Sequence, residues 1–232
     1  MPPLAVSAGT FGGPMRVVIV AAGDLAPGDA RWLDGADLLI AADGGAATLD
    51  LLGRRPDILV GDLDSAAAPL VERLAGAGTD IQRHASDKDA SDTELALDAA
   101  AAAGATEIVL LGALGGARLD HQLANVLLLA DRGLGQADVR VVHGTTTVRV
   151  VGGGGRLDLS GSEGDLVTLL PIGGDAAGVT TRGLRWPLAG DLLAAGRSRG
   201  LSNEITAPPA SVSLERGALL VIETANHEGS PS

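Results

Sequence analysis

The sequence contains no cysteine and very few aromatic residues: one phenylalanine, two tryptophans and no tyrosine among 232 residues. Without cysteine the chain has neither disulfide bonds nor thiolate metal sites, and it suits a reducing compartment, so we expect a cytoplasmic protein. Trp186 therefore stands out as one of only three aromatic side chains.

Basic residues are also scarce, since 17 Lys and Arg oppose 29 Asp and Glu and leave a net charge of −12. This balance opposes binding to nucleic acid or to anionic lipid. The first 15 residues carry no basic residue, and no apolar run approaches the roughly 20 residues needed to span a bilayer. We expect neither export nor membrane insertion, and no nucleic-acid partner.

Two nucleotide-binding signatures are missing as well. The chain has no G-x-x-x-x-G-K-[ST] segment and no G-x-G-x-x-G after its first apolar run. A P-loop and a dinucleotide fingerprint are thus excluded.

Between residues 16 and 143 short apolar runs alternate with segments of helical spacing, a βαβα pattern. Most of the runs are apolar on both faces, as a covered parallel sheet requires. The predicted strands are 16–22, 37–42, 57–60, 79–84, 106–112 and 138–143, and the predicted helices are 45–53, 66–76, 92–103 and 121–132. Gly53, Gly76 and Gly104 are expected to end helices in the left-handed conformation.

After residue 143 the composition changes to short runs rich in Thr, Val and Gly: TTTVRVV, RLDLS, DLVTLLP, GVTTRG, SVSLE and ALLVIET. Their close spacing predicts antiparallel strands of a sandwich or barrel. We therefore expect an α/β domain over residues 15–144 and an all-β domain over 145–225.

Carboxylates follow the ends of several predicted strands. Asp43 lies in ADGG, Asp62 and Asp64 lie in GDLDS, and Asp92 closes DKDASD. Open α/β sheets bind ligands at these strand ends, and carboxylate oxygens favour Mg²⁺ held together with nucleotide phosphates. The pattern indicates phosphoryl or pyrophosphoryl transfer.

The individual acids also have structural explanations. Asp62 and Asp64 would leave an extended backbone on the same side and could share a metal, but Asp64 or Ser65 could equally cap the next helix. Ser91 and Glu94 form a capping box that begins a helix at Asp92, where the helix dipole alone favours an acid.

Two further segments suggest substrate contacts. In GGARLD, Arg118 offers a planar fork for phosphate, while Asp120 could be a simple N-cap. Lys88 could reach a phosphate or neutralise the neighbouring acids. In GLRWPL, Trp186 could stack on a heteroaromatic ring or fill the core, and GLSNEI supplies the polar pair Ser202 and Asn203.

In their order along the chain, ADGGA, GDLDS, DKDASDTELAL, GGARLDHQLAN, TRGLRWPL and GLSNEI resemble the thiamine pyrophosphokinase family from about Ala41 to Asn203. The resemblance implies a three-layer α/β/α domain with a mostly parallel sheet, followed by a β-sandwich domain, in a homodimer. It implies that the diphosphate of ATP is transferred to the hydroxyl of thiamine, giving thiamine diphosphate and AMP, with Mg²⁺ as cofactor.

The resemblance also assigns roles to residues. It implies that Asp43, Asp62, Asp64 and Asp92 are catalytic, with Asp62, Asp64 and Asp92 as metal ligands. For this reaction we expect a nearby aspartate, Asp43 or Asp92, to accept the proton of the hydroxyl. The residues implied near ATP are Lys88, Arg118 and Asp120, and those near thiamine are Asp120, Trp186, Ser202 and Asn203. Ala117 departs from the family pattern, because it inserts one residue between the second glycine and Arg118.

Three other functions share part of this pattern. A related pterin pyrophosphokinase would keep the acidic motifs and lack the TRGLRWPL and GLSNEI segments. A metal-dependent nucleotide phosphohydrolase would use water as the acceptor. A sensor would bind thiamine or nucleotide without turnover.

Overall fold

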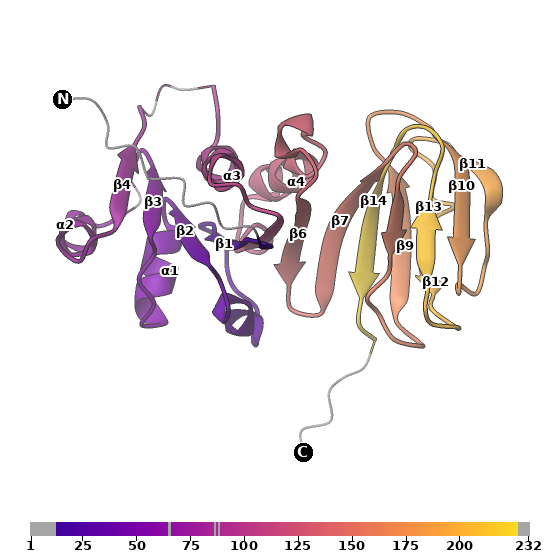
Figure 1. Ribbon diagram of the computed structural model, residues 1–232, viewed down its shortest axis with the longest axis horizontal. Helices are drawn as coiled ribbons and strands as arrows, with labels where there is room; N and C mark the ends of the chain where they lie inside the picture. Colours follow the sequence, from indigo (N-terminus) through magenta and orange to yellow (C-terminus); the bar gives the residue numbers. More distant parts are fainter. Residues whose placement is uncertain (1–12, 65, 86, 88, 227–232) are drawn as a thin grey trace, which may run out of the picture. The chain divides into compact units, whose positions relative to one another are not determined.

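The computed structural model describes residues 13–64, 66–85, 87 and 89–226 (Figure 1). It divides into two compact units. The first is formed chiefly by Ala30–Gly112 together with the first strand, and the second by Asp24–Asp29, Ala113–Asp131 and the chain from Val139 onward. Among the described residues no helix combines the length and the apolarity that a membrane crossing requires.

Five parallel strands form the sheet of the first unit, in the order β5-β1-β2-β3-β4. Nearly all residues of β1, β2 and β5 are buried, which agrees with runs that are apolar on both faces. The strands span β1 Arg16–Val20, β2 Leu38–Ala42, β3 Ile58–Gly61, β4 Asp80–Arg83 and β5 Glu107–Leu111. The predicted parallel sheet is confirmed.

Helices cover both faces of this sheet. The chain passes from β1 to β4 in one direction and then returns through α3 to β5, on the other side of β1. Since such crossovers are right-handed, the reversal places α3 on the face opposite α1 and α2 (Figure 1). The helical segments are α1 Gly45–Leu51, α2 Ala68–Gly76 and α3 Asp92–Ala102, with 3-10 turns η1 Asp29–Leu33 and η2 Arg132–Leu134.

The helix ends follow the local sequence signals with one exception. Gly53 and Gly104 have positive φ values of 65° and 85°, as expected of terminating glycines. Gly76 is instead the last residue of α2, and Gly78, with a φ of 93°, takes the left-handed conformation. The prediction for Gly76 is therefore wrong by two residues.

The second unit is a β-sandwich with one added helix. Its antiparallel sheets have the orders β12-β9-β14-β7-β6 and β11-β10-β13-β8. Val167, Val179, Val212 and Val221 are among the buried residues of their common core. The elements are α4 Leu119–Leu128, β6 Asp138–His143, β7 Thr146–Gly152, β8 Arg156–Asp158, β9 Leu166–Pro171, β10 Ala176–Arg182, β11 Ala189–Leu193, β12 Asn203–Glu204, β13 Ser211–Ser213 and β14 Ala218–Thr224. The predicted sandwich is confirmed, although β11 and β12 were not predicted.

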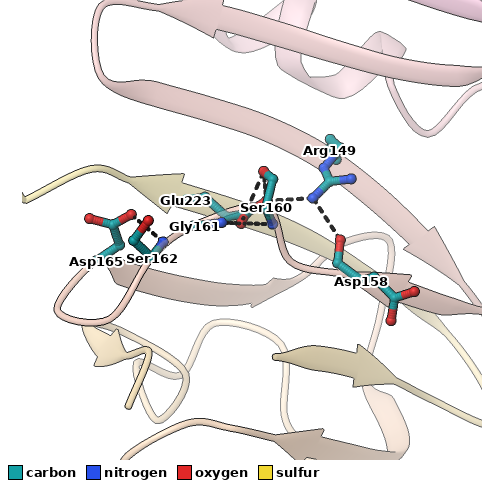
Figure 2. Close-up of polar contacts among 7 residues, drawn as sticks. All are labelled: Arg149, Asp158, Ser160, Gly161, Ser162, Asp165 and Glu223. Atoms are coloured by element: carbon teal, nitrogen blue, oxygen red, sulfur yellow. Dashed lines mark hydrogen bonds and ion pairs between the residues drawn. The ribbon is translucent and has the colours of Figure 1, made fainter. Parts of the chain in front are cut away.

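A buried ion pair connects β7 and β14 inside the sandwich (Figure 2). Arg149 Nη2 donates to Glu223 Oε1 at 2.5 Å, and Glu223 Oε2 accepts from the backbone N–H groups of Ser160 at 2.7 Å and Gly161 at 3.1 Å. Because the carboxylate is paired and hydrogen-bonded, its burial is compensated. The pair fixes the loop between β8 and β9.

Candidate functional site

Asp43 lies directly after β2 and is held by the start of α1. Its backbone has a φ of 42°, its N–H donates to the carbonyl of Val60 at 2.9 Å, and its carbonyl accepts from Ala46 at 3.0 Å. A Cβ on Gly45 would lie 1.9 Å from the carbonyl oxygen of Val20. Glycine at this position therefore lets α1 begin against the end of β1, which places Asp43 at the carboxyl edge of the sheet.

Gly61 and Asp62 form the neighbouring strand end. Gly61 is the last residue of β3 and has a φ of 147°, a conformation that other residues rarely adopt. A Cβ at Gly61 would approach Asp92 Oδ1 to 3.0 Å and Asp43 Cβ to 3.2 Å. The missing side chain makes room for the acids of two other segments.

Only one of the two acids of GDLDS lies close to other acids. Leu63 between them has a φ of 63° and is buried, so the backbone is not extended as the sequence analysis assumed. Asp64 is exposed, and its N–H donates to Asp62 Oδ1 at 3.2 Å. The structure thus groups Asp62 with other acids and leaves Asp64 outside that group.

Asp92 comes from the opposite face of the sheet, at the first position of α3. Ser91 caps this helix, because its Oγ accepts from the backbone N–H of Glu94 at 3.2 Å. The predicted capping hydroxyl is confirmed. It fixes the turn from which the Asp92 carboxylate extends toward β2 and β3.

Asp43, Asp62 and Asp92 together form a three-carboxylate group. One oxygen from each lies within 4.8 Å of the others, although the residues come from three separate segments. Asp43 is only 7% exposed, so water screens its charge poorly. Three acids so close repel one another unless a cation joins them, and hard oxygen donors suit Mg²⁺.

Arg118 and Asp120 form an exposed bidentate pair in the second unit. Arg118 Nε donates to Asp120 Oδ1 at 2.9 Å, and Nη2 donates to Oδ2 at 2.6 Å. These bonds to Arg118 are the main cause of a pKa of Asp120 well below its ordinary value. Asp120 is the second residue of α4 and Arg118 occupies the N-cap position, so Asp120 is not the N-cap.

Two residues that the sequence analysis did not single out hold the glycine loop before Arg118. Gln122 donates to the carbonyl of Gly116 at 3.2 Å and accepts from the N–H of Gly115 at 3.3 Å. Asn125, which is buried, donates to the carbonyl of Ala113 at 3.0 Å. The available signal was their spacing of three residues, which places both polar side chains on one face of α4.

Trp186 is exposed over 56% of its surface and lies next to Asn203 and Arg185 in the sandwich. The guanidinium of Arg185 lies 5.1 Å from the centre of the indole ring. Asn203 is buried and forms two hydrogen bonds with the backbone of Trp186, while Ser202 has a φ of 53° and donates its N–H to Thr168 Oγ1 at 3.0 Å. The core-filling alternative for Trp186 does not hold.

Lys88, which the sequence analysis placed near phosphate, lies outside the described residues, as does Ser65. Of the remaining predicted site residues, the structure brings together Asp43, Asp62 and Asp92. It also brings together Trp186 and Asn203.

Comparison with known proteins identifies relatives along most of the chain. Residues 30–142 match the family model of the thiamin pyrophosphokinase catalytic domain, and residues 156–219 match that of the thiamin pyrophosphokinase vitamin B1 binding domain. Thiamine pyrophosphokinase of Bacillus subtilis is 27% identical over 214 residues, covering 90% of this chain and 99% of the relative.

Solved structures agree with these matches. The crystal structure of thiamine pyrophosphokinase from Bacillus subtilis superposes with a TM-score of 0.81 at 26% identity, covering 91% of this chain and all of the other. The thiamin pyrophosphokinase from Geobacillus thermodenitrificans gives a TM-score of 0.77 at 30% identity, with coverage of 92% and 99%. With both domains matched in order, this chain belongs to the thiamin pyrophosphokinase family.

Proposed function

We propose that this protein transfers the diphosphate group of ATP to the hydroxyl of thiamine and releases AMP. The observation that carries the proposal is the three-carboxylate group of Asp43, Asp62 and Asp92, which lies within the part of the chain matched by the catalytic-domain model. The exposed indole of Trp186 lies within the part matched by the vitamin B1 binding model. A metal-binding edge and a stacking surface are what the two substrates require.

The three carboxylates fit a Mg²⁺ ion, since all donors are oxygens and the glycine at position 61 leaves space beside Asp92. Mg²⁺ bound with ATP offsets the negative charge of the transferred group. We propose Asp43, Asp62 and Asp92 as its protein ligands, and we keep Asp64 as a predicted ligand. Asp43 or Asp92 is proposed to accept the proton of the thiamine hydroxyl.

The cationic side chains are proposed to act on phosphate. Arg118 presents its guanidinium at the start of α4, and Lys88 is assigned the same role by its motif. In both cases fixed positive charge stabilises the transferred diphosphate, and Asp120 orients Arg118 through its two hydrogen bonds. Catalysis then rests on positioning and electrostatics.

Trp186, Ser202, Asn203 and Asp120 are proposed to bind thiamine, either by contacting it directly or by holding the residues that do. An exposed indole offers a flat face for the aminopyrimidine or thiazolium ring of thiamine. By family membership we also propose a homodimer and a cytoplasmic location. Domain boundaries at 15–144 and 145–225 are proposed as well. The limits of the two family models support them, although the second compact unit of the structure also includes Asp24–Asp29, Ala113–Asp131 and the chain from Val139.

The direct test is to incubate the purified full chain with ATP, Mg²⁺ and thiamine and to separate the products by chromatography. We expect AMP and thiamine diphosphate in equal amounts, and no AMP when thiamine is omitted. AMP formed without thiamine would identify a phosphohydrolase, while transfer to a pterin alcohol in place of thiamine would identify the pterin enzyme. Tight thiamine binding without any product would identify a sensor.

A further inference from the structure

The side chain of Asn203 forms two hydrogen bonds with the backbone of Trp186. Its Oδ1 accepts from the N–H of Trp186 at 3.1 Å, and its Nδ2 donates to the carbonyl of the same residue at 2.8 Å. The Oδ1 also accepts from the N–H of Glu204 at 2.9 Å. With Asn203 only 8% exposed, its amide has one N–H left to offer any ligand.

This arrangement continues a short antiparallel ladder by means of a side chain. Leu184 pairs with Ile205, and the N–H of Arg185 donates to the carbonyl of Glu204 at 2.9 Å. At the next step the backbone of Ser202 turns away with a φ of 53° and donates to Thr168. The carboxamide of Asn203 replaces the missing peptide group, because it offers one donor and one acceptor in a plane.

The neighbouring residue, Glu204, is linked to the indole through Arg185. Glu204 forms an ion pair with Arg185 at 2.9 Å, and the guanidinium of Arg185 lies 5.1 Å from the centre of the Trp186 ring. Two adjacent residues of β12 thus hold the backbone of Trp186 and the cation beside its ring. More than half of the Trp186 surface nevertheless stays exposed.

We propose that Asn203 is a positioning residue, which sets the orientation of Trp186 as the stacking surface for thiamine, and that it is not itself a thiamine ligand. This inference rests on the proposed function, because it names how one substrate is recognised. Without both hydrogen bonds the Trp186 backbone can rotate, and the indole then loses its fixed orientation toward the substrate. The expected consequence is weaker thiamine binding with ATP binding unchanged.

The test uses the full chain in a Trp32→Phe background, in which Trp186 is the only tryptophan. We expect Asn203→Ala to raise the KM for thiamine at least fivefold, with the KM for ATP and kcat within twofold. Asn203→Asp keeps the acceptor and loses the donor, so its KM for thiamine should lie between those of the Trp32→Phe protein and the Asn203→Ala variant. Thr146→Val, which removes the contact of Thr146 with Thr224 elsewhere in the sandwich, is the control and should leave all three constants unchanged.

A double-mutant cycle with Trp186→Ala separates positioning from direct contact. If Asn203 acts only through the indole, Asn203→Ala changes the KM for thiamine less than twofold once Trp186 is absent. A fivefold effect that persists in the Trp186→Ala protein would show that Asn203 contacts thiamine and would overturn the proposal. An unchanged KM in the single variant would overturn it as well.

Fluorescence keeps this inference separate from the proposed function. In the Trp32→Phe protein, Asn203→Ala should lower the anisotropy of Trp186 and increase its quenching by acrylamide, whether or not the protein turns over thiamine. Unchanged anisotropy and quenching would refute the positioning role. Absence of thiamine diphosphate from the unsubstituted protein, with the fluorescence change present, would refute the proposed reaction and confine the role of Asn203 to holding Trp186.

Discussion

Gly61 sets the space available to the three carboxylates. A methyl group there would lie 3.0 Å from Asp92 Oδ1, and the φ of 147° would strain any residue with a side chain. We expect Gly61→Ala to reduce kcat at least tenfold and to lower the free energy of unfolding by about 1–3 kcal/mol. Steady-state kinetics and urea unfolding measure the two effects.

Gly76→Ala is the matched control for this substitution. Gly76 ends α2, has no neighbouring atom within 4 Å of an added Cβ, and lies in a helix, where alanine is favoured by about 0.8–1 kcal/mol. Its activity should equal that of the unsubstituted protein. If the Gly61→Ala variant were as active as the unsubstituted protein, the three carboxylates would tolerate displacement.

The three-carboxylate group predicts a strict dependence of activity on its members. Asp62→Asn and Asp92→Asn each remove a charged metal ligand, so we expect kcat at saturating Mg²⁺ to fall at least 100-fold, or about 2.7 kcal/mol in activation free energy. Asp98→Asn alters an exposed acid on the same helix as Asp92 and serves as the control. Near-normal turnover of both variants would refute the metal site.

The position of Asp64 outside the three-carboxylate group could not be predicted from the sequence. Its neighbour Leu63 is buried and takes a left-handed conformation, which is unfavourable for leucine and which no local signal reports. The sequence did predict that acids from separate strand ends converge, since parallel strands share one carboxyl edge. Asp64→Asn, the same change as Asp62→Asn, tests whether this exposed acid also affects the dependence of activity on Mg²⁺.

The exposed pair of Arg118 and Asp120 predicts a shift in titration. Hydrogen bonds from Arg118 hold the pKa of Asp120 well below its ordinary value, so Asp120 stays ionised throughout the neutral range. A lowered pKa in the folded protein stabilises it at pH values above the ordinary pKa, and this contribution is lost as the pH falls through the folded pKa. We expect Arg118→Ala to return the pKa of Asp120 toward its ordinary value in a carboxyl NMR titration.

Salt and a second pair provide the controls for this titration. Both side chains are largely exposed, so added salt should weaken the shift. Arg156→Ala breaks the similar pair with Asp158 and should leave the titration of Asp120 unchanged. An Asp120 pKa insensitive to Arg118→Ala would contradict the assigned cause.

The N-cap of α3, Ser91, also helps to place the carboxylate of Asp92. Ser91→Ala removes the hydroxyl that accepts from Glu94, which should cost about 1 kcal/mol in the free energy of unfolding. Because Asp92 is the first helical residue, fraying of the helix should also weaken Mg²⁺ binding and raise the Mg²⁺ concentration needed for half-maximal activity. Ser91→Thr keeps the hydroxyl and should behave like the unsubstituted protein, and equal stability of all three would exclude a capping role.

At the level of elements, periodicity predicted most of the fold because the strands of the first unit are buried on both faces. The strands missed were β11 and β12. β12 has two residues, and the backbone of Trp186, to which the Asn203 side chain is hydrogen-bonded, lies 17 residues away, so no local pattern marks it. The orientation of Trp186 therefore required the tertiary structure.

The molecule as a whole has one tryptophan in each unit, Trp32 in the first and Trp186 in the second. Glu223→Gln leaves the buried Arg149 without its charged partner and should cost about 3 kcal/mol in the free energy of unfolding. The urea transition reported by Trp186 in the Trp32→Phe protein should shift to lower concentration. Glu163→Gln, at an exposed acid, is the control, and equal midpoints would show that the ion pair contributes little.

Gly45 has a consequence for the variation that this chain can tolerate. Every other L-amino acid has a Cβ, and at this position that atom would lie 1.9 Å from the carbonyl oxygen of Val20. No compensating change of side chain relieves the clash, because the obstacle is backbone. In a saturation library selected for function, position 45 should retain glycine alone, whereas surface positions of α1 such as Leu51 should accept many residues.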